Sequence, residues 1–222
     1  MKLSSQTVNV LKNFSTINQG LLFKKGKVLS TMSAQKNILS EATIPDEIPQ
    51  DFGVYNLNEF LSVLSMYPDA DIAVDGVNIK FANGRKSTAY RATDASMIVT
   101  PPEKKITLPS VDVSFSLSEE DLEWIQKTSA VLGSPNVSVE SDGTDVNMVA
   151  FDATNDSAHV SSLKIEVPST GKYKLIFKTE NLKLIPGSYV VEISSKGIAS
   201  FKNTKDNIQY WIATEAGSNY GV

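Results

Sequence analysis

Apolar residues recur with helical spacing at the start of the chain. Between Ser4 and Asn18 they return every three or four positions, which predicts an amphipathic helix. Its apolar face consists of Thr7, Val10, Leu11, Phe14 and Ile17. A second, shorter helix follows a capping box formed by Asn56 and Glu59. Runs of strand-forming residues between turn signals predict strands at 21–24, 28–32, 37–44, 72–74, 77–81 and 86–91.

The second half of the chain repeats this order. Ser118 and Asp121 cap a predicted helix over 118–132, and a short helix is expected over 180–185. Strands are predicted at 137–140, 146–151, 159–167, 189–193, 198–201 and 208–212. Each half therefore contains a helix, three strands, a second helix and three strands. This repeat predicts an α+β chain of two similar domains.

The two halves meet in a segment with mixed character. Residues 93–109 contain a pair of prolines and a short charged step, but also apolar patches that a disordered linker would not carry. We therefore predict a first domain at 1–92, an extended connector at 93–109 that lies on the surface of both domains, and a second domain at 110–222.

Composition narrows the classes of protein. The chain has no cysteine and a net charge of −4, with its lysines and arginines spread over the whole length. The lack of cysteine favours a reducing interior, and no segment forms a signal peptide or approaches the roughly 20 apolar residues of a membrane span. An acidic chain is poorly suited to gripping phosphates over its whole surface. A small positive face can still hold DNA loosely.

The sequence offers little for catalysis. The single histidine, His159, falls in a predicted strand without a fixed acidic neighbour, which favours a partly exposed strand residue over a catalytic base. The acids at 119–121 and Glu123 lie in the first turns of a helix, where the helix dipole already favours negative charge. No phosphate-binding glycine loop or metal-ligand spacing occurs, so we predict no catalytic residues, no metal site and no cofactor.

The polar faces of the long helices are more informative. If Phe14 is the centre of the buried stripe of the first helix, the opposite face carries Ser5, Asn9, Lys12 and Thr16, with Lys2 beside it. This face is polar and mildly cationic. On the helix over 118–132, Lys127 points outward beside Glu120 and Glu123, and Glu123 and Lys127 are spaced to pair. An ordinary solvated face explains Lys127 as well as a functional one does, and Lys183 is a similar case.

Four segments resemble a known family. They are MKLSSQTVNVLKNFSTINQG, VYNLNEFLSVLSMYPDADI, SEEDLEWIQKTSAVLG and LIPGSYVVEISSKG. The chain resembles, over its whole length, the sliding clamps of T4-like bacteriophages, which are DNA polymerase processivity factors. The opening is the most specific part, because LKNFSTIN is not a general helix pattern.

The resemblance implies a DNA-clamp fold, with two helices packed on antiparallel sheets in each domain. It also implies that three subunits close head to tail into a six-domain ring. Such a ring encircles duplex DNA topologically, without sequence specificity, and tethers the phage DNA polymerase. The implied partners are therefore duplex DNA, the polymerase, a clamp-loader ATPase and two further copies of the chain, with other replication or late-transcription proteins using the ring as a moving platform. The expected location is the cytoplasm of the infected bacterial host, at replication forks.

The resemblance also assigns residues. The DNA-facing set on the channel wall is Lys2, Asn9, Lys12, Lys127 and Lys183, and the last two match less well because Glu120 and Glu123 interrupt the positive face. A hydrophobic pocket for a partner peptide is expected beside the connector, bordered by Met97, Ile98, Val99, Ile106 and Leu108. An equally weighted alternative is that these five residues only pin the connector to the domains.

Two other functions compete with the clamp. A non-enzymatic, β-rich structural phage protein would also be acidic and built of paired domains, but it would have no reason to keep small polar residues and lysines on its helix faces. An enzyme is the third possibility, but the only candidates for its catalytic group are scattered acids and one histidine.

Overall fold

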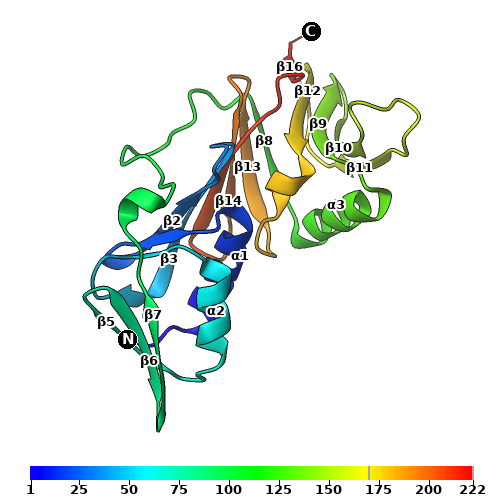
Figure 1. The fold of residues 1–222 in the computed structure, drawn as a ribbon. Helices are drawn as coiled ribbons and strands as arrows, with labels where there is room; N and C mark the ends of the chain where they lie inside the picture. The colour runs from blue at the N-terminus through cyan, green and yellow to red at the C-terminus, as the bar shows by residue number, and fades with distance from the viewer. Residues whose placement is uncertain (170, 222) are drawn as a thin grey trace. The chain divides into compact units, whose positions relative to one another are not determined.

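The computed structural model describes residues 1–169 and 171–221 (Figure 1). The chain divides into two compact units, Met1–Lys104 and Lys105–Val222. The division falls inside the segment 93–109 that was predicted to connect two domains. Each unit combines helices with antiparallel sheets, as expected for an α+β chain.

The first unit begins with a helix and contains three small groups of paired strands. In chain order its elements are α1 (Ser5–Ile17), β1 (Leu21–Phe23), β2 (Gly26–Met32), β3 (Ile38–Ile48), β4 (Phe52–Val54), α2 (Leu57–Ser65), β5 (Asp71–Asp75), β6 (Asn78–Asn83), β7 (Lys86–Arg91) and the 3-10 turn η1 (Ala95–Met97). Antiparallel pairing joins β1 to β4, β2 to β3, and β5 to β6 to β7. Both helices predicted for this half are present.

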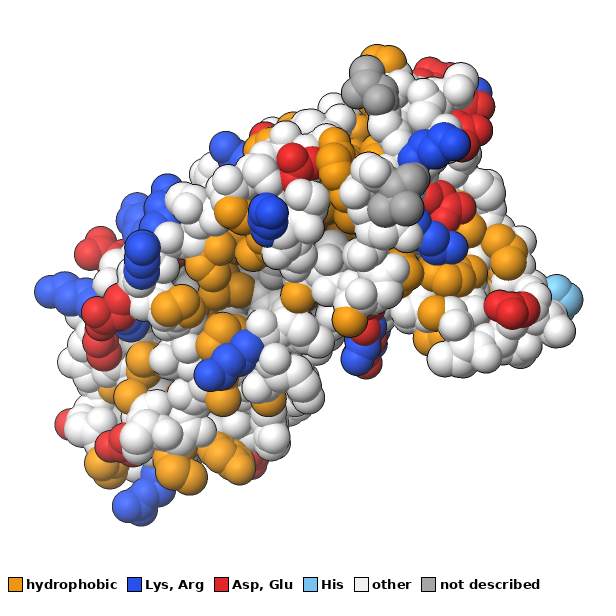
Figure 2. Space-filling model, turned by 90° about the horizontal axis from the view of Figure 1, so that it is seen from above, with side chains coloured by type: hydrophobic (Ala, Val, Ile, Leu, Met, Phe, Trp, Pro, Cys, Tyr) orange, Lys and Arg blue, Asp and Glu red, His pale blue; other side chains and the backbone are white. Residues whose placement is uncertain are grey.

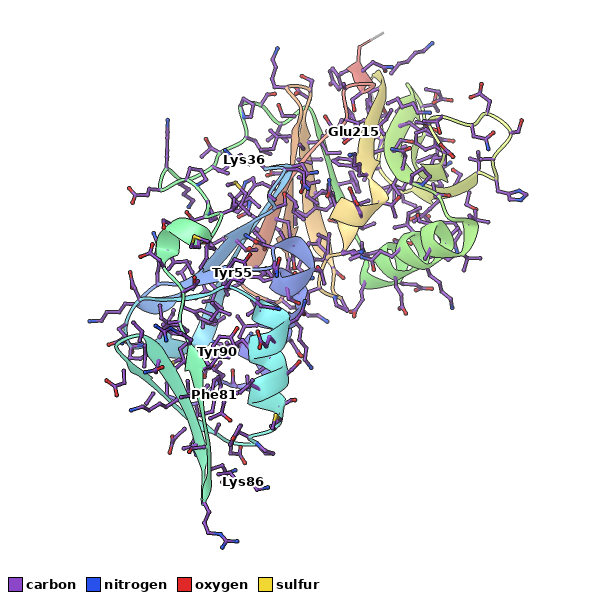
Figure 3. All side chains as sticks on the ribbon, viewed as in Figure 1. Lys36, Tyr55, Phe81, Lys86, Tyr90 and Glu215 are labelled. Carbon is purple, nitrogen blue, oxygen red and sulfur yellow. The ribbon has the colours of Figure 1, made fainter. Side chains whose placement is uncertain are left out.

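Aromatic side chains hold the first unit together. Phe60 of α2 lies 5.8 Å from Phe23, 5.3 Å from Phe81 and 5.8 Å from Tyr90, measured between ring centroids. Phe23 in turn stacks on Phe52 at 4.5 Å. One helical residue therefore joins the β1–β4 pair to the β5–β7 sheet, and Figure 3 shows Phe81 and Tyr90 on that sheet beside α2. Each aromatic pair contributes about 1 kcal/mol of stability beyond the contribution from the apolar area that it buries.

One edge of the β5–β7 sheet is already occupied. The carbonyl oxygen of Met1 accepts a hydrogen bond from the backbone N–H of Ile72 at 2.8 Å, and the amino group of Met1 donates to the carbonyl of Ile72 at 2.6 Å. The start of the chain thus covers β5 at this point. Strand β7, at the opposite edge, has only β6 as a strand neighbour.

The second unit has more strands. In chain order its elements are β8 (Val113–Leu117), α3 (Glu119–Leu132), β9 (Asn136–Asp142), β10 (Val146–Phe151), β11 (Ser161–Ile165), β12 (Lys172–Lys178), the 3-10 turn η2 (Thr179–Leu182), β13 (Tyr189–Ser194), β14 (Ile198–Asn203), β15 (Ile208–Ala213) and β16 (Asn219–Tyr220). One sheet runs β11-β10-β9-β12-β16, and another joins β15, β14, β13 and β8 in that order. Helix α3 packs on β10 and β11.

Local signals explain the bounds of α3. The side chain of Ser118 accepts a hydrogen bond from the backbone N–H of Asp121 at 3.1 Å, which confirms the predicted cap. The helix ends at Gly133, which has a positive φ of 64° that favours glycine.

The structure has more strands than the repeat predicted. Strands β4 and β12 complete a run of four strands after the first helix of each half, and β8 and β16 were also not predicted. Strand β4 has only three residues and contains Gly53, so its sequence carries almost no signal. In β12, by contrast, Tyr173, Leu175 and Phe177 are buried at every second position, which is a strand signal that the three-strand interpretation missed.

The fourth predicted helix is reduced to the single turn η2. Lys178 supplies no side-chain cap, and Ile185 precedes Pro186, which disfavours helical backbone at Ile185. Two buried tyrosines bind the Ile185 peptide groups instead. The hydroxyl of Tyr210 accepts from the Ile185 N–H at 3.2 Å, and the hydroxyl of Tyr189 donates to the Ile185 carbonyl at 2.6 Å.

These tyrosines make unfolding depend on alkaline pH. Burial raises the pKa of Tyr189 to about 12, and burial also raises the pKa of Tyr210. Because the folded-state pKa lies above the unfolded value of about 10, the stabilisation is complete below that pH and is lost as the pH rises towards 12. We expect the free energy of unfolding, measured with urea, to fall by roughly 1–3 kcal/mol between about pH 9 and about pH 12 from this effect. Tyr189→Phe should remove part of the slope, and an unchanged slope would contradict this account.

Candidate nucleic-acid interface

Helix α1 has one buried face and one open face. Thr7, Val10, Leu11 and Phe14 are buried, and Leu11 and Phe14 have no exposed surface. The opposite face consists of the exposed residues Ser5, Asn9, Lys12 and Thr16. The helix therefore has the orientation expected from the sequence, and it contains no acidic residue.

The start of α1 is fixed by a carboxylate from β3. Asp46 accepts hydrogen bonds from the backbone N–H of Ser4 at 2.6 Å and from its hydroxyl at 2.8 Å. Partial burial opposes ionisation of Asp46, but hydrogen bonds from Thr7 and Ser4 outweigh it and hold the pKa of the carboxyl below its usual value. A negative charge at this end also complements the helix dipole. Asp46 thus holds α1 in place on the sheet.

Lys12 of α1 and Lys2, which precedes the helix, border a hollow between the two helices of the first unit. A cavity of about 330 Å³ lies between α1 and α2, with an apolar floor and Lys2 and Lys12 among its lining residues. Both lysines are exposed. The structure therefore places Lys2 and Lys12 at one cavity, together with Asp69, whereas Asn9 lies on the outer face of α1 and does not line it.

Helix α3 presents a different surface. Its exposed residues include Glu120, Glu123, Trp124, Lys127 and Val131. Trp124 is 40 % exposed and Val131 is 77 % exposed, so the face is partly apolar. The pairing expected between Glu123 and Lys127 does not occur among the ion pairs of the described residues. With four acids and Lys127 as its one cation, α3 is net negative.

Lys183 lies beside α3 rather than on a helix of its own. The side-chain amide of Gln126 donates a hydrogen bond to the carbonyl of Leu182 at 2.6 Å, which ties the end of η2 to α3. Lys183 follows directly and is exposed. Lys127 and Lys183 therefore belong to one layer of the second unit, although only Lys127 is helical. On the face shown in Figure 2, basic side chains are interspersed with acidic and apolar ones.

The first half of the connector is bound to the first unit. The backbone N–H of Thr93 donates to the carbonyl of Gly53 at 2.9 Å, and Ile98 is buried against Gly20 and Gly53. Its neighbours Met97 and Val99 are exposed. Ile98 thus holds the connector on the first unit, whereas the side chains of Met97 and Val99 face solvent.

The second half of the connector belongs to the other unit. Ile106 and Leu108 are half-buried there and lie in no helix or strand. The five proposed pocket residues are therefore divided between the two units, and the partner pocket stays a prediction.

Of the residues considered for catalysis, all but Asp121 are exposed. His159 lies in the loop before β11, not inside a strand as predicted, because the strand begins only at Ser161. The acids Glu119 and Glu120 are exposed and Asp121 is half-buried, all in the first turn of α3. The described residues contain no group of three or more histidine, cysteine or acidic side chains that could hold a metal ion. None of their helices is long and apolar enough to cross a membrane.

Two residues of interest were missed by sequence reasoning. Trp124 was not singled out, although its position opposite Leu122 and Ile125 on a helical wheel places it outward. Asn18 appeared only as the last residue of a helix. Its side chain bonds to Met32 and Val99, which are distant in sequence and could not have been inferred from local pattern.

Family comparison covers nearly the whole chain. Residues 2–100 match a family described as "DNA polymerase processivity factor", and residues 114–216 match "gp45 sliding clamp, C terminal". The sliding clamp of Vibrio phage KVP40 is 32 % identical over 222 residues, which cover 97 % of this chain and 100 % of the relative. The sliding clamps of Escherichia phage RB69 and Enterobacteria phage T4 are each 32 % identical over 230 residues, covering 99 % of both chains.

Solved structures share the fold at much lower identity. PCNA from Thermococcus kodakaraensis superposes with a TM-score of 0.67 at 15 % identity, covering 96 % of this chain and 98 % of that one. The Helicobacter pylori beta clamp bound to a DNA ligase peptide superposes with a TM-score of 0.70 at 15 % identity, covering 97 % of this chain and 65 % of that one. The predicted DNA-clamp fold is confirmed.

The attachment of the connector can be tested at Gly53. A Cβ atom at this position would lie 2.5 Å from the carbonyl oxygen of Thr93, too close for the backbone to stay in place. We expect Gly53→Ala to lower the free energy of unfolding, measured with urea, by roughly 1–3 kcal/mol. Gly171→Ala is the matched control, because a Cβ there meets nothing within 4 Å. Equal stability of the two variants would show that the connector is free to move away from Gly53.

Proposed function

This chain belongs to the sliding clamps of T4-like bacteriophages, the DNA polymerase processivity factors, and we propose that it works as a homotrimeric ring lined by the outer face of α1. As a member of this family it assembles into a ring on duplex DNA and tethers the DNA polymerase. The finer assignments of subunit number, channel residues and further partners are proposals.

The observation that carries the channel assignment is the outer face of α1. A chain with a net charge of −4 keeps this face free of acids, with Lys12 on it and Lys2 just before the helix. Water-exposed lysines attract phosphates over a distance set by the salt concentration, about 8–10 Å at physiological ionic strength. The attraction is weak enough for the ring to slide, because the closed ring itself prevents escape. Asn9 adds a neutral hydrogen-bonding group, while Lys127 and Lys183 are weaker members beside the acids of α3.

The free strand edges support closure of the ring between copies. Strands β7 and β11 each end a sheet within their own unit. Because Ala92 donates to Val77 at 2.9 Å and the register pairs Arg91 with Asn78, alternate N–H groups of β7, including that of Ala89, point away from β6. We propose that β7 of one copy pairs with β11 of the next, head to tail, with three chains supplying six units.

The remaining proposals follow from this assembly. A closed ring needs outside work to be opened on DNA, and this sequence has no ATP-binding loop, so a clamp-loader ATPase is the proposed partner. The chain itself is proposed to have no catalytic activity. Met97 and Val99 of the first unit are proposed to receive an apolar peptide of the polymerase and of other replication or late-transcription proteins. The proposed location is the replication fork in the cytoplasm of the infected host.

The channel assignment is tested by reversing one charge. Lys12→Glu places an acid on the outer face of α1 without touching its core, so the ring should assemble but hold DNA for a shorter time. We expect loader-dependent primer-extension products to shorten roughly threefold or more at physiological salt. Lys24→Glu, which changes the net charge equally but lies outside α1, is the control. Full-length products from the Lys12 variant would remove Lys12 from the DNA-facing set.

The ring interface is tested by blocking one strand edge. Ala89→Pro removes an outward N–H of β7 and adds a ring that prevents strand pairing. Light scattering over a concentration series should then show a loss of trimer, at a concentration where the native chain has the mass of three. The control is Val74→Pro on β5, the opposite edge of the same sheet, where Met1 already pairs with the neighbouring Ile72. A trimer formed by the Ala89 variant would show that β7 is not the interface.

A further inference from the structure

One side chain at the end of α1 bonds to three other parts of the first unit. The amide nitrogen of Asn18 donates to the carbonyl of Met32, at the end of β2, at 2.9 Å. It also donates to the carbonyl of Val99 in the connector at 3.0 Å. The amide oxygen accepts from the backbone N–H of Gly20 at 3.1 Å. Both N–H donors and the oxygen of this amide are therefore used.

These bonds complete the attachment of the connector. Its first half is held at Thr93 by Gly53 and at Ile98 by burial against Gly20 and Gly53. Asn18 provides the next contact along the connector, at the carbonyl of Val99. Without Asn18, Val99 would lose this side-chain hydrogen bond to the first unit.

We propose that Asn18 is a positioning residue that sets the course of the connector and so presents Met97 and Val99 to the polymerase. The proposal rests on the proposed partner surface at these two residues. The proposal further states that the position of this surface depends on Asn18, the C-cap of α1. The outer face of the same helix is the one assigned to DNA. The channel helix and the partner surface thus share one amide group.

The chemistry of the site selects asparagine. Two carbonyl oxygens point at one side chain, so it must offer two donors, while the N–H of Gly20 requires an acceptor. Aspartate keeps the acceptor but loses both donors and places negative charge against two carbonyls. Alanine removes all three bonds. The two substitutions therefore separate the donor contacts from the contact to Gly20.

The positioning role is tested by amide hydrogen exchange on the assembled ring. In Asn18→Ala and in Asn18→Asp, the N–H groups of Met97 and Ile98, which bond within η1, should exchange at least about tenfold faster than in the native chain. The matched control is Ser15→Ala, which removes a bond inside α1, to the Lys12 carbonyl, without touching the connector. Native exchange rates at these two amides in both Asn18 variants would overturn the proposal.

The functional part is tested by the affinity of the ring for the polymerase. A mobile connector adopts the binding conformation for only a fraction of the time, so Asn18→Ala should weaken binding roughly five- to tenfold, with Ser15→Ala unchanged. Unchanged affinity in Asn18→Ala, when Met97→Ala does weaken binding, would overturn the presentation role. Unchanged affinity in Met97→Ala would instead refute the proposed partner surface, and the exchange measurement would still decide whether Asn18 positions the connector.

Discussion

A helix can aim one face at a ligand only if its opposite face is held still, and this constraint governs the first unit. Leu11 and Phe14 fix the rotation of α1 through complete burial. Asp46 fixes its first turn, and Asn18 ends it with bonds to β2 and the connector. Each anchor lies on a different strand or segment, so the direction in which Lys12 points depends on the packing of the whole unit.

The repeated architecture carries two different surfaces. Both units place a long helix on antiparallel strands, yet α1 has an acid-free polar face and α3 combines acids with an exposed tryptophan. The units also differ in their second helical element. The first has a helix, α2, that inserts Phe60 among aromatic rings, whereas the second has a single 3-10 turn, followed by Ile185, whose peptide groups bond to the hydroxyls of two buried tyrosines. A duplicated scaffold can therefore keep its strand order while its helical layer diverges.

The sequence predicted what depends on local pattern. Periodicity and capping residues located all three α-helices, and the outer face calculated around Phe14 matches the exposed residues of α1. Short strands such as β4 escaped because three residues carry too little pattern. The opposite orientations of Ile98 and its neighbours could not be predicted, because they depend on the missing Cβ atoms of Gly20 and Gly53, far away in sequence. The shortening of the fourth helix to η2 has local causes, the uncapped start at Lys178 and the proline after Ile185, but the bond from the Ile185 N–H to Tyr210 could not be inferred from local pattern.

The pairing of Met1 with Ile72 gives the β5–β7 sheet a direction. With β5 covered at that point and β7 open, the sheet can be extended from one side only. Each chain can then form one strand-pairing contact through this sheet, at β7. In a closed assembly every β7 edge is paired. In the proposed assembly, an incomplete ring leaves one β7 edge and one β11 edge exposed, so the partly built ring, rather than the finished one, would be the species most prone to unwanted strand pairing.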